Sequence, residues 1–150
     1  MPQSLSKVYV HLVFGTKNQI NIIDSDIENE LHPYMAKLFR ECDSPIIIIN
    51  STSNHIHNLF LLSRKFTISQ VVEKVKKTSS KWIKTKGEQY KSFYWQNGYG
   101  AFSISQSHVA VVKKYISNQK QHHKKTSFKE EYIKLLEKYE VDYDERYIWD

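Results

Sequence analysis

The sequence predicts an α+β domain built on an antiparallel sheet, with two helices between the strands and two further helices after them. Two patterns lead to this prediction. Apolar residues that alternate along short segments mark strands, and apolar residues at helical spacing mark helices. At 150 residues, with 40% hydrophobic residues and neither linker nor repeat, residues 1–150 are expected to form a single domain.

A strand and a helix open the predicted fold. The strand is expected at 5–16, where four apolar residues from Val8 to Phe14 alternate with partly polar ones. Acidic residues and a serine at 24–28 predict a helix N-terminus, and apolar residues recur at helical spacing from there to about Arg40.

A hairpin and a second helix come next. The β-branched run 46–49 predicts a strand, and 55–62 predicts its return strand after a polar turn. Thr67 or Ser69 can cap the second helix, and Gly87 ends it.

The fourth strand is expected to be aromatic and to run from 93–95 through a glycine-containing turn into 101–105. Ser105 or Ser107 can cap a third helix, and a fourth begins at about Phe128. This order is the split βαβ pattern of a ferredoxin-like βαββαβ sheet with two additional C-terminal helices. Two helices would cover one face of the sheet, leaving the other face free for a ligand or partner.

Composition excludes several classes of protein. The single cysteine, Cys42, cannot form an intramolecular disulfide or supply a zinc site built on several thiolates. No apolar stretch approaches the roughly 20 residues of a membrane span, and the N-terminus lacks the pattern of an export signal. We therefore expect a cytoplasmic protein without a membrane partner.

Charge is distributed unevenly along the chain. Lys and Arg number 22 against 16 Asp and Glu, but the segment 137–150 is acidic, which leaves twenty bases and ten acids before it. Such a basic body attracts polyanions, above all nucleic acid, although a well-solvated lysine-rich surface is the alternative explanation. The acidic segment also carries aromatic residues from Tyr143 to Trp149, so it is expected to dock on the domain.

Two pairs of residues carry candidate chemistry. On a strand, His55 and His57 lie on one face, close enough to share a divalent ion, but two ligands are too few and a solvated strand face is an equal alternative. Tyr115 and Gln119 are four apart in a predicted helix and so share a face. A core tyrosine beside a solvated glutamine is the simpler interpretation of that second pair.

Three motifs in this order resemble those of the HUH-type single-tyrosine transposases of small bacterial insertion sequences and of their relatives at repeated extragenic palindromes. They are Asn-His-Ile-His-Asn at 54–58, Trp-Gln-Asn-Gly-Tyr-Gly at 95–100, and Tyr-Ile-Ser-Asn-Gln at 115–119 followed by two histidines. The similarity runs through nearly the whole chain. The family often has an acidic residue before the first histidine, where this sequence has Asn54.

The resemblance implies a metal-dependent enzyme that cleaves single-stranded DNA and transfers the strand at hairpin-containing element ends. It implies that His55, His57 and Gln119 bind Mg²⁺ or Mn²⁺ and that Tyr115 is the nucleophile, giving a 5′-phosphotyrosine. It also implies a homodimer in which the tyrosine helix of one subunit completes the site of the other.

Basic residues fit a single-stranded or hairpin DNA partner. Between Arg64 and Lys91 there are nine bases and two acids, with aromatic residues close by that can stack on bases. Other lysines flank Tyr115, and His122 and His123 either join them or lie on the surface. The candidate DNA contacts are Arg64, Lys65, Lys74, Lys76, Lys77, Lys81, Lys113, Lys114 and Lys120.

Other functions remain open from the residues alone. Charge and aromatic residues without the joined motifs would fit a non-catalytic nucleic-acid-binding module of ferredoxin-like fold. A related HUH nickase for replication or plasmid transfer is usually larger and carries further domains. A phosphoesterase with two His-x-Thr/Ser motifs is disfavoured because the sequence lacks such a motif.

Overall fold

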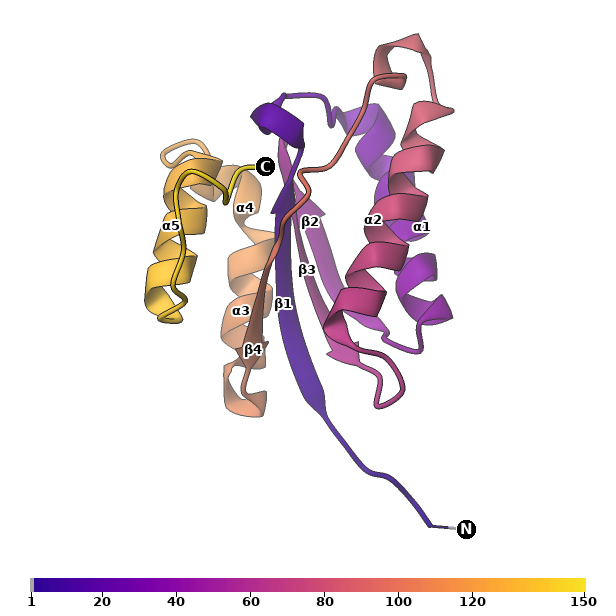
Figure 1. Cartoon of the computed structure of the whole chain (residues 1–150), viewed down its shortest axis with the longest axis vertical. Coiled ribbons are helices and arrows are strands. Elements are labelled where there is room, and N and C mark those ends of the chain that lie inside the picture. Colours follow the sequence, from indigo (N-terminus) through magenta and orange to yellow (C-terminus); the bar gives the residue numbers. More distant parts are fainter. Residues whose placement is uncertain (1) are drawn as a thin grey trace.

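The computed structural model describes residues 2–150, which form an antiparallel four-stranded sheet flanked by helices (Figure 1). The strands are β1 (Val8–Gly15), β2 (Ile46–Ser51), β3 (His55–Leu62) and β4 (Gly100–Ile104). They lie in the order β2-β3-β1-β4, and every neighbouring pair is antiparallel. The predicted α+β class is confirmed, and the strand order is the one that the split βαβ pattern gives.

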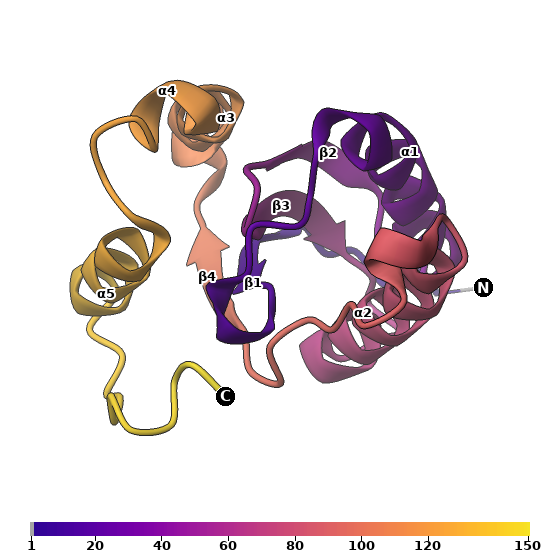
Figure 2. The ribbon, with the colours of Figure 1, turned by 90° about the horizontal axis from the view of Figure 1, so that it is seen from above.

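Two long helices, α1 (Ser25–Glu41) and α2 (Ile68–Lys84), cover one face of the sheet (Figure 2). Each begins at a predicted cap. The Asp24 side chain accepts a hydrogen bond from the backbone N–H of Ile27, and Thr67 forms a reciprocal capping box with Gln70. Alternate residues of β1, from Val10 to Phe14, pack against these helices in the largest hydrophobic core.

The other face of the sheet is also covered, so the expectation of a free face is wrong. Helices α3 (Val109–Ser117), α4 (Gln119–His122) and α5 (Phe128–Lys138) lie on it, opposite α1 and α2 (Figure 2). The physical reason is that this face is itself apolar or aromatic. Tyr9 and Leu59 pack there with Val112 and Ile116, and Val13 packs with Phe128.

Two other element predictions differ from the structure. The third helix is divided at Asn118 into α3 and α4, because this residue leaves helical geometry at φ −96° and ψ 15°. The fourth strand contains only 100–104 of the predicted segment. Trp95 forms a single bridge to Thr16, and the chain before it includes a short 3₁₀ turn at Glu88–Tyr90. Further 3₁₀ turns lie at Lys17–Gln19 and Gln106–His108.

The acidic C-terminal segment docks on the loop that precedes β4. The backbone N–H of Gly98 donates to the carbonyl of Asp150 at 3.0 Å, and Nε2 of Gln96 donates to the carbonyl of Ile148 at 3.0 Å. Trp149 contacts the rings of Phe128 and Tyr132 on α5. No helix within residues 2–150 is both long enough and apolar enough to span a bilayer.

Candidate active site

His55 and His57 lie two residues apart on β3, so both side chains project from the face covered by α3, α4 and α5. Both are fully buried, and their ring centroids lie 5.2 Å apart. Nε2 of His55 lies 3.3 Å from Oε1 of Glu131, and Nε2 of His57 lies 3.0 Å from the same oxygen. The two imidazoles therefore converge on one point.

The outer nitrogen of each imidazole is held by a neighbouring side chain. Nδ1 of His55 lies 2.8 Å from Oγ1 of Thr52 and 2.9 Å from Oδ1 of Asn54. Asn54 thus offers a neutral acceptor at the position where an acid is common in the family pattern. Nδ1 of His57 lies 2.8 Å from Nε2 of His11, which is buried on β1. These contacts fix the ring orientations and point both Nε2 atoms inward.

Glu131 occupies the centre of the cluster, although it comes from α5, 74 residues after His57. Its side chain is 2% exposed, and both carboxylate oxygens have partners. Oε1 also lies 2.9 Å from Nε2 of His123, while Oε2 accepts a hydrogen bond from Nε2 of Gln119 at 3.0 Å. The hydroxyl of Tyr115 donates to Oε2 as well.

Packing at the start of α5 delivers Glu131 to this point. The side chain of Ser127 caps the helix through the backbone N–H of Glu130. Phe128 then stacks on the ring of His55 at a centroid distance of 4.3 Å. A Cβ at Gly15 would lie 2.6 Å from the Phe128 ring, so the close approach of α5 to β1 requires glycine at that position.

Tyr115 and Gln119 reach the same centre from either side of the break at Asn118. The Tyr115 ring lies 5.8 Å from the ring of His57, and Gln119 is fully buried with its Oε1 3.3 Å from Nε2 of His55. The two residues belong to different helices, α3 and α4, yet the short separation keeps their side chains together.

Burial and local charge shift the pKa values of this cluster. Burial lowers the pKa of His55 to about 4, so its imidazole is neutral at pH 7. Burial acts to raise the pKa of Glu131, but its contacts with His123, His55 and His57 outweigh burial and hold the pKa well below its usual range. Burial, followed by the charge of Glu131, raises the pKa of Tyr115, so the phenol stays protonated.

The donor set fits a divalent cation. One ligand atom from each of His55, His57, His123 and Glu131 lies within 4.8 Å of the others, and three of these residues are buried while His123 is partly so. Neutral imidazoles with a carboxylate form a combination that binds transition metals, and the carboxylate and amide oxygens also suit harder ions such as Mg²⁺ and Mn²⁺. The amide oxygen of Gln119 faces the same centre.

Comparison with known proteins identifies the family. Residues 4–119 match the sequence model of a protein family described as IS200-like transposases. The chain belongs to this family. It is therefore an HUH-type tyrosine transposase, as the three sequence motifs indicated. No curated protein matches the chain in sequence.

Two solved structures share the fold of this transposase. A provisionally assigned transposase from Deinococcus radiodurans R1 aligns with a TM-score of 0.62 and 17% identity, over 79% of this chain and 98% of that one. A REP-associated tyrosine transposase bound to a REP hairpin aligns with a TM-score of 0.61 and 14% identity, over 82% of this chain and 73% of that one.

The transposase brings its candidate nucleophile and its histidine pair together within one chain. The resemblance implied that Tyr115 of one subunit completes the site of another, whereas here Tyr115, His55 and His57 surround a carboxylate of their own chain.

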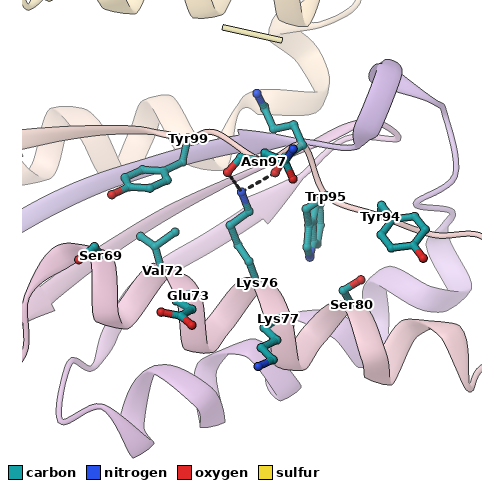
Figure 3. A pocket seen from close by; sticks show the side chains of 11 residues that line it. Ser69, Val72, Glu73, Lys76, Lys77, Ser80, Tyr94, Trp95, Asn97 and Tyr99 are labelled. Atoms are coloured by element: carbon teal, nitrogen blue, oxygen red, sulfur yellow. Dashed lines mark hydrogen bonds between the residues drawn. The ribbon is translucent and has the colours of Figure 1, made fainter. Parts of the chain in front are cut away.

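Lys76 has a structural role that the sequence did not predict. From α2 its Nζ atom points at the loop before β4 (Figure 3), where it donates to the carbonyls of Gln96, Asn97 and Gly98 at 2.5, 3.0 and 2.8 Å. Burial lowers the pKa of Lys76 to about 8. Its donors are committed to the backbone, so Lys76 is not a free phosphate contact.

Other predicted DNA contacts lie on two parts of the transposase. Lys120 is partly committed, since its Nζ contacts Glu28 at 2.8 Å and the carbonyl of Ser51 at 3.1 Å. The other candidates are exposed, and Lys77 lines a cavity of about 330 Å³ beside Tyr94 and Tyr99 (Figure 3). The exposed candidates are Arg64, Lys65, Lys74, Lys77 and Lys81 near or on α2, and Lys113 and Lys114 on α3.

Sequence reasoning missed Glu131 and gave His123 no definite role. A signal for Glu131 was present. On α5, Glu131 follows Phe128 by three residues and precedes Leu135 by four, so the three residues share one side of the helix. Glu131 is therefore an acid within an apolar helix face. An ionisable residue in such a stripe marks a buried polar partner elsewhere in the fold.

Proposed function

We propose that this transposase cleaves single-stranded DNA by attack of the Tyr115 hydroxyl oxygen on a phosphodiester, with the help of a divalent cation. The observation that carries the proposal is that Tyr115, Gln119 and both motif histidines converge on one buried carboxylate, Glu131. A core tyrosine would not need so many polar partners, whereas a nucleophile beside a cation site does.

His55, His57 and Glu131 are proposed as ligands of Mg²⁺ or Mn²⁺, with Gln119 as the further ligand that the family resemblance implies and His123 beside them. Bound there, the cation would polarise a non-bridging phosphate oxygen and offset the negative charge that develops during attack. Because Glu131 supplies a hard oxygen and a full negative charge, it makes the site better suited to these ions than imidazoles alone would.

The protein groups account for the rest of the step. The Tyr115 oxygen forms a bond to phosphorus, the bond from phosphorus to the 3′-oxygen breaks, and the departing 3′-oxygen takes up a proton. Glu131 Oε2 accepts the hydrogen bond of the Tyr115 hydroxyl and so orients the nucleophilic oxygen, and the phenol proton leaves to water as the bond to phosphorus forms, which balances the proton that the 3′-oxygen takes up. The products are a 5′-phosphotyrosine and a free 3′-OH. A second 3′-OH can reverse the reaction and join new ends.

Hairpin-containing ends are proposed as the substrate. The basic body of the chain, the exposed lysines of α2 and α3, and the hairpin bound by the REP-associated relative support this choice. Since a single chain already brings the candidate groups together, we propose that the site works in cis, whether or not two copies associate as a homodimer. We also propose that residues 1–150 act as one domain.

A Tyr115→Phe variant tests the proposed function. The wild-type protein, mixed with Mn²⁺ and single-stranded DNA from the regions flanking its gene, should gain the mass of a DNA fragment in denaturing mass spectrometry. Tyr115→Phe should bind the same DNA and gain no mass, while Tyr94→Phe, an exposed tyrosine, should behave as wild type. DNA binding by the wild type without any adduct would instead support a non-catalytic DNA-binding module.

A further inference from the structure

A second cavity adjoins the Tyr115 hydroxyl, between α3 and α5. Its volume is about 240 Å³, and both Tyr115 and Glu131 line it, so a group inside the cavity lies directly beside the candidate nucleophile and its hydrogen-bond acceptor. It is separate from the cavity of Figure 3, which is lined by α2 and the loop before β4.

The inner wall of this cavity is apolar and includes an aromatic ring held in place. Val112 and Leu135 are buried, and Tyr139 lies between two parts of the core. The Tyr139 ring stacks on Phe102 with centroids 4.7 Å apart and an interplanar angle of 21°. A ring fixed in this way can contact a planar ligand with little loss of side-chain entropy.

The charged residues at the cavity are cationic apart from Glu131. Lys134 and Lys138 are exposed and lie four residues apart on α5, so they occupy one face of the helix. Among the described lining residues Glu131 is the single acid, and its oxygens are already occupied by Tyr115, Gln119 and the histidines. The cavity therefore combines an apolar interior with positive charge, which complements a nucleobase joined to phosphates.

The size of the cavity restricts the ligand further. A volume of about 240 Å³ is below the roughly 300–1,000 Å³ of pockets that enclose drug-sized ligands, so the cavity suits a small planar group such as one nucleobase. A base enters such a cavity only when it is unstacked and unpaired.

We infer that this cavity receives the unpaired nucleobase adjacent to the scissile phosphate, while Lys134 and Lys138 contact the flanking backbone. The inference rests on the proposed function, because it assigns the cavity to the DNA strand that Tyr115 attacks. It adds a protein pocket for one base, and a base in that pocket would have to be unpaired.

A Val111→Trp variant tests the inference. Val111 lines the cavity and is 55% exposed, so a tryptophan can fill the space without disturbing the core. Ala110→Trp is the matched control, since Ala110 is the preceding exposed residue of α3 and is not part of the lining. The measurement is fluorescence anisotropy of labelled single-stranded DNA in EDTA, for the intact strand and for strands with one abasic nucleotide at each position in turn.

In the wild type and in Ala110→Trp, one abasic position should weaken binding by about 5- to 150-fold, the equivalent of about 1–3 kcal/mol for one stacked base. Val111→Trp should bind the intact strand about 5- to 150-fold more weakly than the wild type does, and an abasic nucleotide at that position should no longer weaken its binding. Equal affinities and equal abasic profiles for all three proteins would overturn the inference, even if the wild type forms the Tyr115 adduct. Conversely, the expected binding pattern without any adduct would support the cavity and contradict the proposed cleavage.

A second pair of variants keeps the test decisive if Val111→Trp does not fold. Lys134→Ala combined with Lys138→Ala should lower the salt dependence of binding, log K against log salt, by about 1.4, because each phosphate contact to single-stranded DNA contributes about 0.7. Lys37→Ala combined with Arg40→Ala, two exposed positions on α1 across the sheet, should leave the slope unchanged. Equal slopes in both double variants would place the strand elsewhere and overturn the inference.

Discussion

The hydroxyl of Tyr115 donates a hydrogen bond to Oε2 of Glu131, which joins α3 to α5 at the centre of the candidate active site. The other oxygen of the same carboxylate faces His55 and His57. Burial and the negative charge of Glu131 raise the pKa of Tyr115 and keep the phenol protonated. A cation beside Glu131 would offset that charge, so the contact would couple activation of the proposed nucleophile to metal binding.

Replacing Glu131 by glutamine should weaken metal binding. The substitution removes the negative charge and leaves the side chain nearly the same size. We expect the dissociation constant for Mn²⁺, measured by isothermal titration calorimetry, to rise by at least about tenfold. Glu130→Gln, at the exposed neighbouring position, should bind Mn²⁺ as the wild type does. Equal affinities for both variants would remove Glu131 from the proposed ligand set.

Replacing His11 by phenylalanine should also weaken metal binding, although His11 is not a proposed ligand. The variant keeps an aromatic ring beside His57 and removes the nitrogen that lies 2.8 Å from Nδ1 of His57. Loss of such a supporting contact typically costs about 10–100-fold in metal affinity. Tyr9→Phe, which removes a hydroxyl bonded to Gln106 on the same strand, is the control. If both variants bind Mn²⁺ equally well, the His11 contact does not orient the ligand.

Acid should destabilise the metal-free protein through His55. Its pKa is about 4 when folded and about 6.5 when exposed, so the unfolded state binds a proton more readily. The stability that His55 contributes is therefore full above pH 6.5 and is lost as the pH falls toward 4. The loss is on the order of 3 kcal/mol. The free energy of unfolding in urea should fall more steeply with decreasing pH for the wild type than for His55→Asn. An equal pH dependence for the two proteins would contradict the prediction.

Lys76 and Lys77 should behave differently despite being neighbours. Lys76→Met leaves carbonyls of the loop at 96–98 without their donor, so we expect a loss of about 1–3 kcal/mol in unfolding free energy, measured by urea denaturation. Lys77→Ala should leave stability unchanged and reduce the salt dependence of DNA binding by about 0.7. If Lys76→Met is as stable as the wild type and its DNA binding depends less on salt, then Lys76 contacts DNA phosphates and does not support the loop.

Local patterns predicted most of the fold because each element satisfies its own periodicity and capping. Asp24 and Thr67 cap the helices where the sequence placed them, and the isoleucine run at 46–49 lies within a strand. The break at Asn118 was not predictable, because the residues on both sides have helical spacing. The covered second face was not predictable from β1 alone, because the residues on that side of the strand, Tyr9, His11 and Val13, are of mixed polarity.

The site was predictable in part. His55, His57, Tyr115 and Gln119 were singled out through the family resemblance of their motifs, because spacing alone left a solvated strand face and a core tyrosine as alternatives. Glu131 depends on a contact across 74 residues, and an acid in the first turn of a helix ordinarily serves the helix dipole. The commitment of Lys76 was hidden for a similar reason, because its partners are backbone carbonyls of a loop 20 to 22 residues away.

The most direct test of the central claim, that one chain assembles the complete site, is complementation between two inactive variants. His57→Ala retains the nucleophile and Tyr115→Phe retains the histidine pair. The two are mixed with Mn²⁺ and DNA from the flanking regions, and covalent protein–DNA adduct is measured by denaturing mass spectrometry. Assembly in cis predicts no adduct in the mixture, as in each variant alone. An adduct on the His57→Ala chain, formed only in the mixture, would show that the site is shared between subunits and would contradict the claim.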